Sequence, residues 1–387
     1  MKTAASVATF DQVAAASDVL IVCGAGGVGK TTTAAAIAVR VAQTQQRRVL
    51  VLTIDPAKRL AEALGMEAVG NVARMVDIGV GAAGNLSVAM LDTSASWDDL
   101  VRSNAPDETT ATKILANPLY RNITQRFVQS HDYIAMERLY ELRNKGDYDL
   151  IVIDTPPSRH ALDFLDAPAR MADFFSSALL KWITLPYRLG GERAGRLGYL
   201  AAKPFYQVAD RILGSDFLRD IAEFFLLFQS MYEGFVQRAN SVTGLLHLPS
   251  TGFVVVSTLE PSPLHEAEFF LNELERRKLS VGALVLNRTL PDVFTNTEAI
   301  AAASVLSTVK GGRGSGAADE KLRVRRAVGE TFLRFSALAM SESVQEGRLA
   351  RRPDVVLRIP LMERPITEVD DLRLLASFFA TNAESSR

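Results

Sequence analysis

A glycine-rich segment near the N-terminus sets the strongest limit on how this chain can fold. Residues 24–31 read GAGGVGKT, fit the pattern G-x-x-x-x-G-K-[ST], and lie between an apolar run and a helical pattern at 31–43. In a strand–loop–helix unit of this kind, backbone N–H groups and the helix N-terminus surround phosphate oxygens. We therefore expect a phosphate-binding loop in which Lys30 reaches the β- and γ-phosphates and the Thr31 hydroxyl binds Mg²⁺.

The same glycines also fit a second pattern. Gly24, Gly26 and Gly29 have the G-x-G-x-x-G spacing of dinucleotide-binding loops, and Asp55 follows the next apolar run, where an acid could bind a ribose. The Lys-Thr pair after the last glycine favours a nucleoside triphosphate, because a dinucleotide loop has no use for it. A dinucleotide-dependent oxidoreductase stays as the weaker alternative.

A second nucleotide signal lies in the middle of the chain. Asp154 ends the apolar run LIVID and is followed by TPPSRH. An acid at the end of a buried strand can hold the Mg²⁺ shell of an NTPase, and the loop after it can sense the γ-phosphate. The two signals together favour an NTPase.

Short β-branched runs alternate with helical patterns along the chain. The runs occupy residues 19–23, 48–55, 86–91, 150–154, 253–257, 283–287 and 355–359. This alternation predicts an α/β fold with a doubly wound, mostly parallel sheet of the P-loop NTPase type.

Two long helical stretches interrupt the alternation and predict an inserted α-helical subdomain, at 97–147 and 167–248. The expected ATPase core then comprises 1–96, 148–166 with the second switch, and 249–387 with the adenine-binding part. A Gly-rich segment at 310–319 is expected to be a flexible loop inside the last part.

Composition excludes several classes of protein. Lys and Arg total 43 against 44 Asp and Glu, so no global charge favours a nucleic-acid partner. The chain has one cysteine and four scattered histidines, which excludes a paired-cysteine zinc site. No apolar run is long enough to span a membrane. We expect a cytoplasmic protein and leave peripheral membrane contact open.

Three segments, in this order, resemble the ArsA family of ATPases. They are GAGGVGKTTT (24–33), TIDPAKRLAEALG (53–65) and DTPPSRHALDFLDAP (154–168). Residues 257–288 and 358–372 resemble the late part of the same family. The family includes the arsenite-pump ATPase and the guided-entry ATPase that targets tail-anchored proteins. The resemblance implies hydrolysis of ATP to ADP and phosphate with Mg²⁺.

The resemblance also implies a role for each matching residue. Asp55 would activate the attacking water, Asp154 would hold the Mg²⁺ shell together with Thr31, and Asn287 would read adenine. Lys30, Asp55 and Asp154 are thus the expected catalytic residues. The expected nucleotide-binding residues are Gly26, Gly27, Val28, Gly29, Lys30, Thr31, Thr32, Asn287, Pro360, Leu361 and Met362.

The sequence departs from the family pattern at informative places. Ala25 stands where relatives carry a signature lysine that contacts nucleotide across a dimer interface, and Arg159 replaces a glycine of the second switch. The family resemblance therefore implies a homo-oligomer or a heterodimer with a paralogous ATPase that supplies the lysine. Arg159, Lys58 and Arg59 are alternative cations within the chain. The missing cysteines argue against arsenite extrusion and exclude a zinc-clasped homodimer.

One helical pattern in the second insert has two interpretations. The apolar residues Phe217, Ile221, Phe224, Phe228, Met231 and Phe235 recur at spacings of four and three and so share one face. This face is either the core of the subdomain or a groove for an apolar client or membrane protein. The leading hypothesis is an ATPase that acts in protein targeting, anion handling or envelope maintenance. The alternative is a ParA/MinD-like nucleotide-switched assembly protein.

Overall fold

The computed structural model describes most of the chain. The described residues are 8–54, 60, 64, 66, 70–79, 85–126, 128–156, 166–167, 170, 173, 224–227, 231–309, 317–349 and 353–380. Asp55, Arg159, Phe217, Ile221 and Phe228 lie outside these ranges. The roles expected for them stay predictions.

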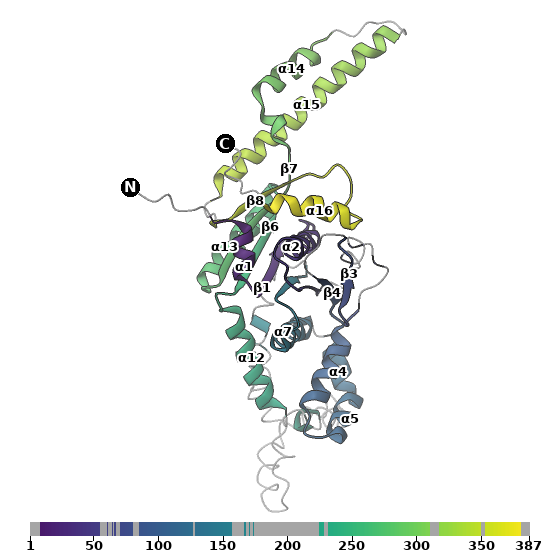
Figure 1. Cartoon of the computed structure of the whole chain (residues 1–387), viewed down its shortest axis with the longest axis vertical. Coiled ribbons are helices and arrows are strands. Elements are labelled where there is room, and N and C mark those ends of the chain that lie inside the picture. The colour runs from purple at the N-terminus through teal and green to yellow at the C-terminus, as the bar shows by residue number, and fades with distance from the viewer. Residues whose placement is uncertain are drawn as a thin grey trace, which may run out of the picture.

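The centre of the molecule is an eight-stranded sheet in the order β3-β4-β2-β5-β1-β6-β7-β8 (Figure 1). The strands are β1 (Val19–Gly24), β2 (Val49–Thr53), β3 (Arg74–Val76), β4 (Leu86–Met90), β5 (Leu150–Asp154), β6 (Thr251–Ser257), β7 (Ser280–Thr289) and β8 (Val356–Pro360). Neighbouring strands are parallel except β3 and β4, which are antiparallel. The expected α/β fold with a mostly parallel sheet is confirmed.

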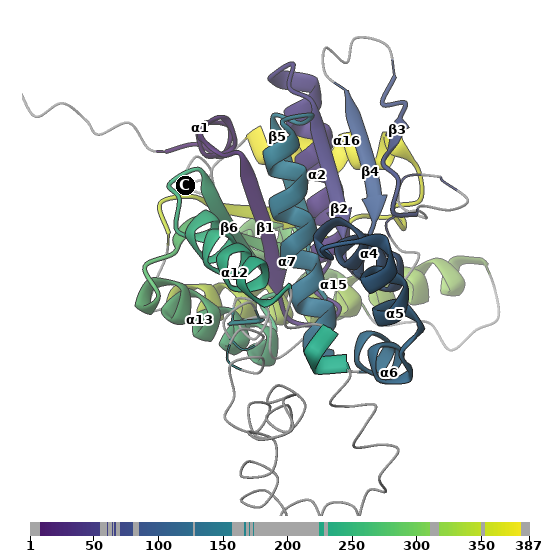
Figure 2. The same ribbon diagram turned by 90° about the horizontal axis from the view of Figure 1, so that it is seen from below.

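The central strands consist almost wholly of apolar residues because both faces of the sheet are covered. Successive side chains point to opposite faces. Val19 and Ile21 therefore belong to one hydrophobic core, and Leu20 and Val22 to the other. The second core is covered by α1 (Phe10–Ala16), α2 (Lys30–Thr44) and α16 (Val369–Ser377). The first is covered by α7 (Val128–Lys145), α12 (Tyr232–Leu246) and α13 (Pro261–Arg276), and Figure 2 looks onto this face.

A group of helices follows β4, in the region where the sequence predicts the helical subdomain. It begins at Thr93, four residues before the expected boundary, because the Asp92 side chain caps the helix by accepting a hydrogen bond from the backbone N–H of Ala95. Its helices are α4 (Thr93–Asn104), α5 (Glu108–Ala116), α6 (Pro118–Arg126) and α7. The rings of Trp97 and Tyr133 pack with their centroids 5.7 Å apart and so join α4 to α7. The division into domains itself stays a prediction.

Two members of the predicted apolar helix face are described with their side chains. Phe224 and Met231 are both buried in the core that includes α7 and α12. For these two residues the structure favours the interpretation as core rather than as an open groove. The side chains of the other four residues of that face lie outside the described part.

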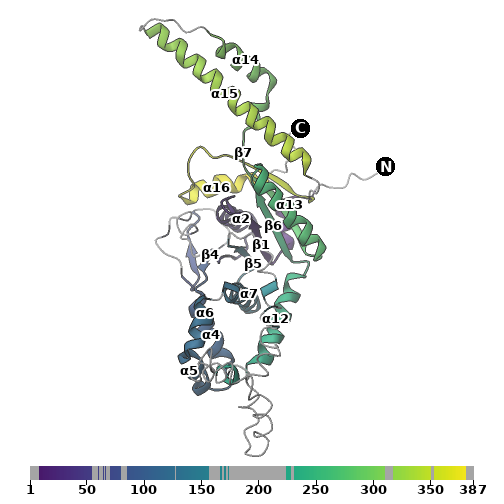
Figure 3. The same cartoon turned by 180° about the vertical axis from the view of Figure 1, so that it is seen from behind.

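A helical arm is inserted between β7 and β8. It contains η1 (Asp292–Thr295), α14 (Thr297–Ser307) and α15 (Ala317–Arg348). Figures 1 and 3 show that the arm and the helices α4 and α5 lie at opposite ends of the molecule. The sequence analysis did not predict this arm, and α15 already includes the last three residues of the expected loop 310–319. Among the described helices, none has the length and apolar character needed to cross a bilayer.

Candidate nucleotide-binding site

The loop between β1 and α2 can form only with glycine at two of its positions. Gly24 and Gly29 have φ angles of +149° and +98°. A Cβ atom on Gly24 would lie 2.1 Å from the Val256 carbonyl oxygen, and one on Gly29 would lie 2.2 Å from Nδ2 of Asn287. The loop backbone therefore passes close to β6 and β7. Gly29 is also the N-cap of α2 and leaves the first N–H groups of that helix without a side-chain cap.

Lys30 lies inside this loop. Its buried Nζ atom donates hydrogen bonds to the carbonyl oxygens of Gly24, at 3.1 Å, and of Ala25, at 2.8 Å. The positive charge is thus held where the loop backbone curves around it. The neighbouring Cys23 is no nucleophile, because burial raises the pKa of its thiol to about 12 against the opposing effect of Lys30.

Asp154 joins the loop to the ends of β2 and β5. Its fully buried Oδ2 atom accepts a hydrogen bond from Oγ1 of Thr31 at 2.7 Å and another from Oγ1 of Thr53 at 3.0 Å. The parallel register places Asp154 opposite Val22 on one side and opposite Thr53 on the other. A hydroxyl and a carboxylate in contact are the oxygen ligands that Mg²⁺ prefers, so these residues fit that ion.

Thr53 was missed by the sequence analysis. It ends β2 two residues before Asp55, and its hydroxyl is buried against Asp154. A polar residue at the C-terminal end of an otherwise apolar strand is a usable signal, because the carboxyl ends of parallel strands meet at one edge of the sheet.

The expected adenine-binding residues lie on β7 and β8. Asn287 is buried, and its Nδ2 donates a 2.7 Å hydrogen bond to the Val28 carbonyl oxygen. It therefore lies against the phosphate loop, although β6 separates β7 from β1 in the sheet. Pro360 ends β8, and the N–H of the half-exposed Leu361 donates to the Thr289 carbonyl oxygen at 2.9 Å. Met362 packs against the core formed with α2.

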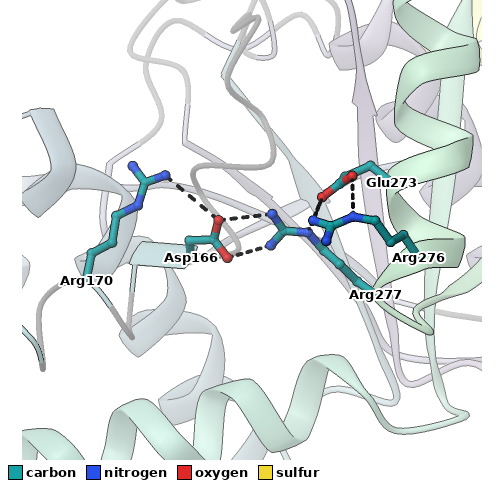
Figure 4. Close-up of polar contacts among 5 residues, drawn as sticks. All are labelled: Asp166, Arg170, Glu273, Arg276 and Arg277. Atoms are coloured by element: carbon teal, nitrogen blue, oxygen red, sulfur yellow. Dashed lines mark hydrogen bonds and ion pairs between the residues drawn. The ribbon is translucent and has the colours of Figure 1, made fainter.

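The chain after the second switch is anchored to α13, which the sequence did not reveal. Figure 4 shows Asp166 held by both terminal nitrogens of Arg277, with one hydrogen bond of 3.0 Å, and approached by Arg170 at 3.8 Å. Arg277 also contacts Glu273 at 2.9 Å. Hydrogen bonds from Arg276 and Arg277 lower the pKa of Glu273 to about 2. The network is therefore charged at neutral pH.

Comparison with known proteins shows similarity to one family of ATPases. Residues 17–188, which include the loop and Asp154, match the family model described as anion-transporting ATPase, ArsA. This part of the chain is similar to the ArsA family of P-loop ATPases. It is 28% identical to "ATPase get3" of Aspergillus terreus over 70% of this chain and 73% of the relative. It is 27% identical to "ATPase get3" of Aspergillus niger over 70% of this chain and 72% of the relative.

The similarity to ArsA-family ATPases supports an enzyme that binds and hydrolyses ATP. Ala25 is the loop residue that was expected to replace a signature lysine. Ala25 is almost fully buried and packs in the core on the α2 face of the sheet. Its methyl group carries no charge, so this position cannot present a cation to a nucleotide in a neighbouring subunit.

Proposed function

We propose that this chain is an Mg²⁺-dependent ATPase whose nucleotide state rearranges the helical subdomain, which holds an apolar client or partner. The observation that carries the proposal is the hydrogen bond between Thr31 and Asp154. It connects the phosphate loop directly to the end of β5, from which the chain enters the second switch. Thr31 and Asp154 would hold a metal ion there and so connect it to both elements.

The proposed nucleotide contacts follow from the geometry of the loop. Backbone N–H groups of Gly26, Gly27, Val28 and Gly29 would surround the phosphates, together with Lys30, Thr31 and Thr32. Lys30 exchanges its bonds to two loop carbonyls for bonds to phosphate oxygens. Asn287 and Pro360 to Met362 would contact the adenosine part. Bound Mg²⁺ would neutralise charge that develops on the transferred phosphoryl group.

The segment that would couple the nucleotide to the helical subdomain is held by hydrogen bonds at both of its ends. At one end, Oγ1 of Thr155 donates a 2.9 Å hydrogen bond to the Val22 carbonyl oxygen of β1. At the other end, Arg277 on α13 holds Asp166. Residues 156–165 connect these points, and residues 155–160 would form the second switch. A change at the γ-phosphate therefore acts on a segment that leads directly into the second helical stretch.

Assembly and cellular role complete the proposal. Because Ala25 supplies no cation, a paralogous ATPase in a heterodimer would donate the lysine, and a homo-oligomer is the alternative. The protein would act in the cytoplasm or at the membrane periphery, in protein targeting, anion handling or envelope maintenance. It needs neither zinc nor nucleic acid.

The test separates binding from hydrolysis. Asp55→Asn should bind ATP like the wild type while hydrolysis falls by about 100-fold or more, because a water-activating group is lost. In a pull-down with ATP, this variant should retain partner and client. The matched variant Lys30→Ala should bind neither ATP nor client. ATPase rates near wild type for Asp55→Asn would remove Asp55 from its role, and equal client retention by Lys30→Ala would contradict nucleotide coupling.

A further inference from the structure

The arm, residues 292–349, exposes a row of large apolar side chains on α15. We call the row the seam: Val324, Val328, Phe335 and Leu338, which are 57%, 55%, 38% and 57% exposed. Their spacings of four, seven and three residues place them on one face of the helix. Contiguous exposed apolar side chains of this kind mark interaction surfaces.

The other helix of the arm does not cover the seam. α14 packs on α15 at Gly329, where a Cβ atom would lie 2.6 Å from both the Ala303 carbonyl oxygen and the Ser307 nitrogen. Gly329 is one residue beyond Val328 and so lies about 100° further around the helix. At the inner end of the arm, Phe335 contacts the ring of Phe294 at 5.2 Å. The outer half of the seam stays open among the described residues.

Basic side chains flank the seam. Between Lys321 and Leu338 the sequence has five basic residues and one acidic residue. Glu330, the acidic residue, pairs with Arg326 at 2.8 Å. The other four basic residues, Lys321, Arg323, Arg325 and Arg334, are exposed. The surface that receives the seam must therefore be apolar beneath and negatively charged around it.

We propose that the seam docks the arm onto the surface of an anionic phospholipid bilayer. An apolar helix face between rows of Lys and Arg lies in the interface, with its apolar residues among the acyl chains and its cations at the headgroups. A second copy of the arm fits less well, because it would bring the same basic rows together. The arm lies at the end of the molecule opposite α4 and α5, so the approach to a flat surface is unobstructed (Figures 1 and 3).

This proposal names the surface that would make the peripheral membrane contact included in the proposed function. Membrane binding by the seam does not depend on ATP hydrolysis. The test is co-sedimentation of the full chain with vesicles of phosphatidylcholine, and with vesicles that also contain phosphatidylglycerol. The chain should bind the anionic vesicles and be released by high salt, which screens exposed charges. Equal binding to both kinds of vesicle would overturn the proposal. Binding to neither kind would also overturn it, because the partner that covers the seam would then be a protein.

Two variants locate the contact. Val324→Asp with Val328→Asp should abolish binding to anionic vesicles. Arg323→Ala with Arg325→Ala should weaken it about 30-fold, since each basic side chain near an anionic surface contributes about fivefold.

The matched control uses the same helix. Met340 and Val344 are 51% and 52% exposed on the side of α15 away from the seam. Met340→Asp with Val344→Asp should therefore bind vesicles like the wild type. ATP turnover and helical circular dichroism should be unchanged in every variant. Equal loss of vesicle binding in the control would contradict the seam, whereas loss of turnover alone would bear on the proposed function.

Discussion

Asp154 shows how contacts from two neighbouring strands and a helix fix the position of a single residue. It lies on β5, opposite Val22 of β1 and Thr53 of β2, and below Thr31 of α2. Two hydroxyl groups donate to one carboxylate oxygen, so its orientation is set before a metal ion binds. If Thr31 turns away from this contact to bind a metal ion, as the proposed function implies, the hydrogen bond from Thr53 still holds the carboxylate.

We expect Thr53→Val to reduce the effect of Mg²⁺ on ATP binding without changing the fold. The substitution keeps the shape of the side chain but removes one donor from a buried carboxylate, which costs about 1–3 kcal/mol of unfolding free energy. Titration of ATP binding with Mg²⁺ and chemical unfolding measure the two effects.

Thr251→Val is the control for this prediction. Thr251 is buried on β6 and donates a 2.7 Å hydrogen bond to the Leu245 carbonyl oxygen, away from Asp154. The Thr251→Val variant should be less stable than the wild type but should respond to Mg²⁺ as the wild type does. The same Mg²⁺ response in both variants would show that Thr53 does not position Asp154.

Two ion pairs join segments of the protein that are far apart in the sequence. Arg277 of α13 holds Asp166, at the start of the second helical stretch. Within the helical subdomain, Arg238 of α12 contacts Glu137 of α7 at 2.7 Å, and the Tyr133 hydroxyl donates to the same carboxylate at 3.0 Å. Both residues of the first pair are partly exposed, whereas Glu137 in the second pair is buried, so the two pairs have different energetic consequences.

Arg277→Gln should reduce the effect of ATP on the helical subdomain while changing stability by less than about 1 kcal/mol, as expected for a partly exposed pair. Amide hydrogen exchange in α7, with and without ATP, is the measurement. Arg276→Gln is a matched control, because Arg276 pairs with Glu273 but not with Asp166. If both variants keep the full response to ATP, Asp166 is not a fixed end of the switch.

Arg238→Met should destabilise the protein by about 3–5 kcal/mol at neutral pH, because it leaves Glu137 charged and buried. Burial already raises the pKa of Glu137, against the opposing charge of Arg238. A carboxyl whose pKa is higher in the folded state favours folding most below its unfolded pKa, and this contribution is lost as pH rises through the folded pKa. The destabilisation should therefore shrink in mild acid, as unfolding at several pH values would show. A loss that does not vary with pH would contradict an uncompensated Glu137.

At the scale of the whole molecule, the sheet separates two cores and carries helical insertions at both ends. The helical subdomain follows β4 and β5, whereas the arm connects β7 to β8, next to the proposed adenine contacts. Arg358 of β8 contacts both Asp292 of η1 at 3.5 Å and Glu346 of α15 at 3.8 Å. The base of the arm is thus attached two residues before Pro360.

Turnover should depend on a second subunit. The isolated chain is expected to hydrolyse ATP slowly, and a paralogous ATPase that carries the signature lysine should raise the rate by about 10³-fold or more, as a cation supplied in trans can. The measurement is phosphate release with and without co-purifying proteins. Fast turnover by the isolated chain that survives Arg159→Ala, Lys58→Ala and Arg59→Ala would exclude both the partner and the internal cations.

The sequence by itself determined the glycine-rich loop between β1 and α2, seven of the strands and the acid Asp154 at the end of β5. These features are local, because glycine conformation, β-branched runs and a strand-ending acid are visible within a few residues. β3 escaped prediction because its three residues are largely exposed and show no apolar pattern. The tertiary structure decided three contacts: Asn287 with Val28, the Thr53 hydroxyl with Asp154, and Arg277 with Asp166. Each joins residues more than 100 positions apart, and only the packing of the sheet brings them within hydrogen-bonding distance.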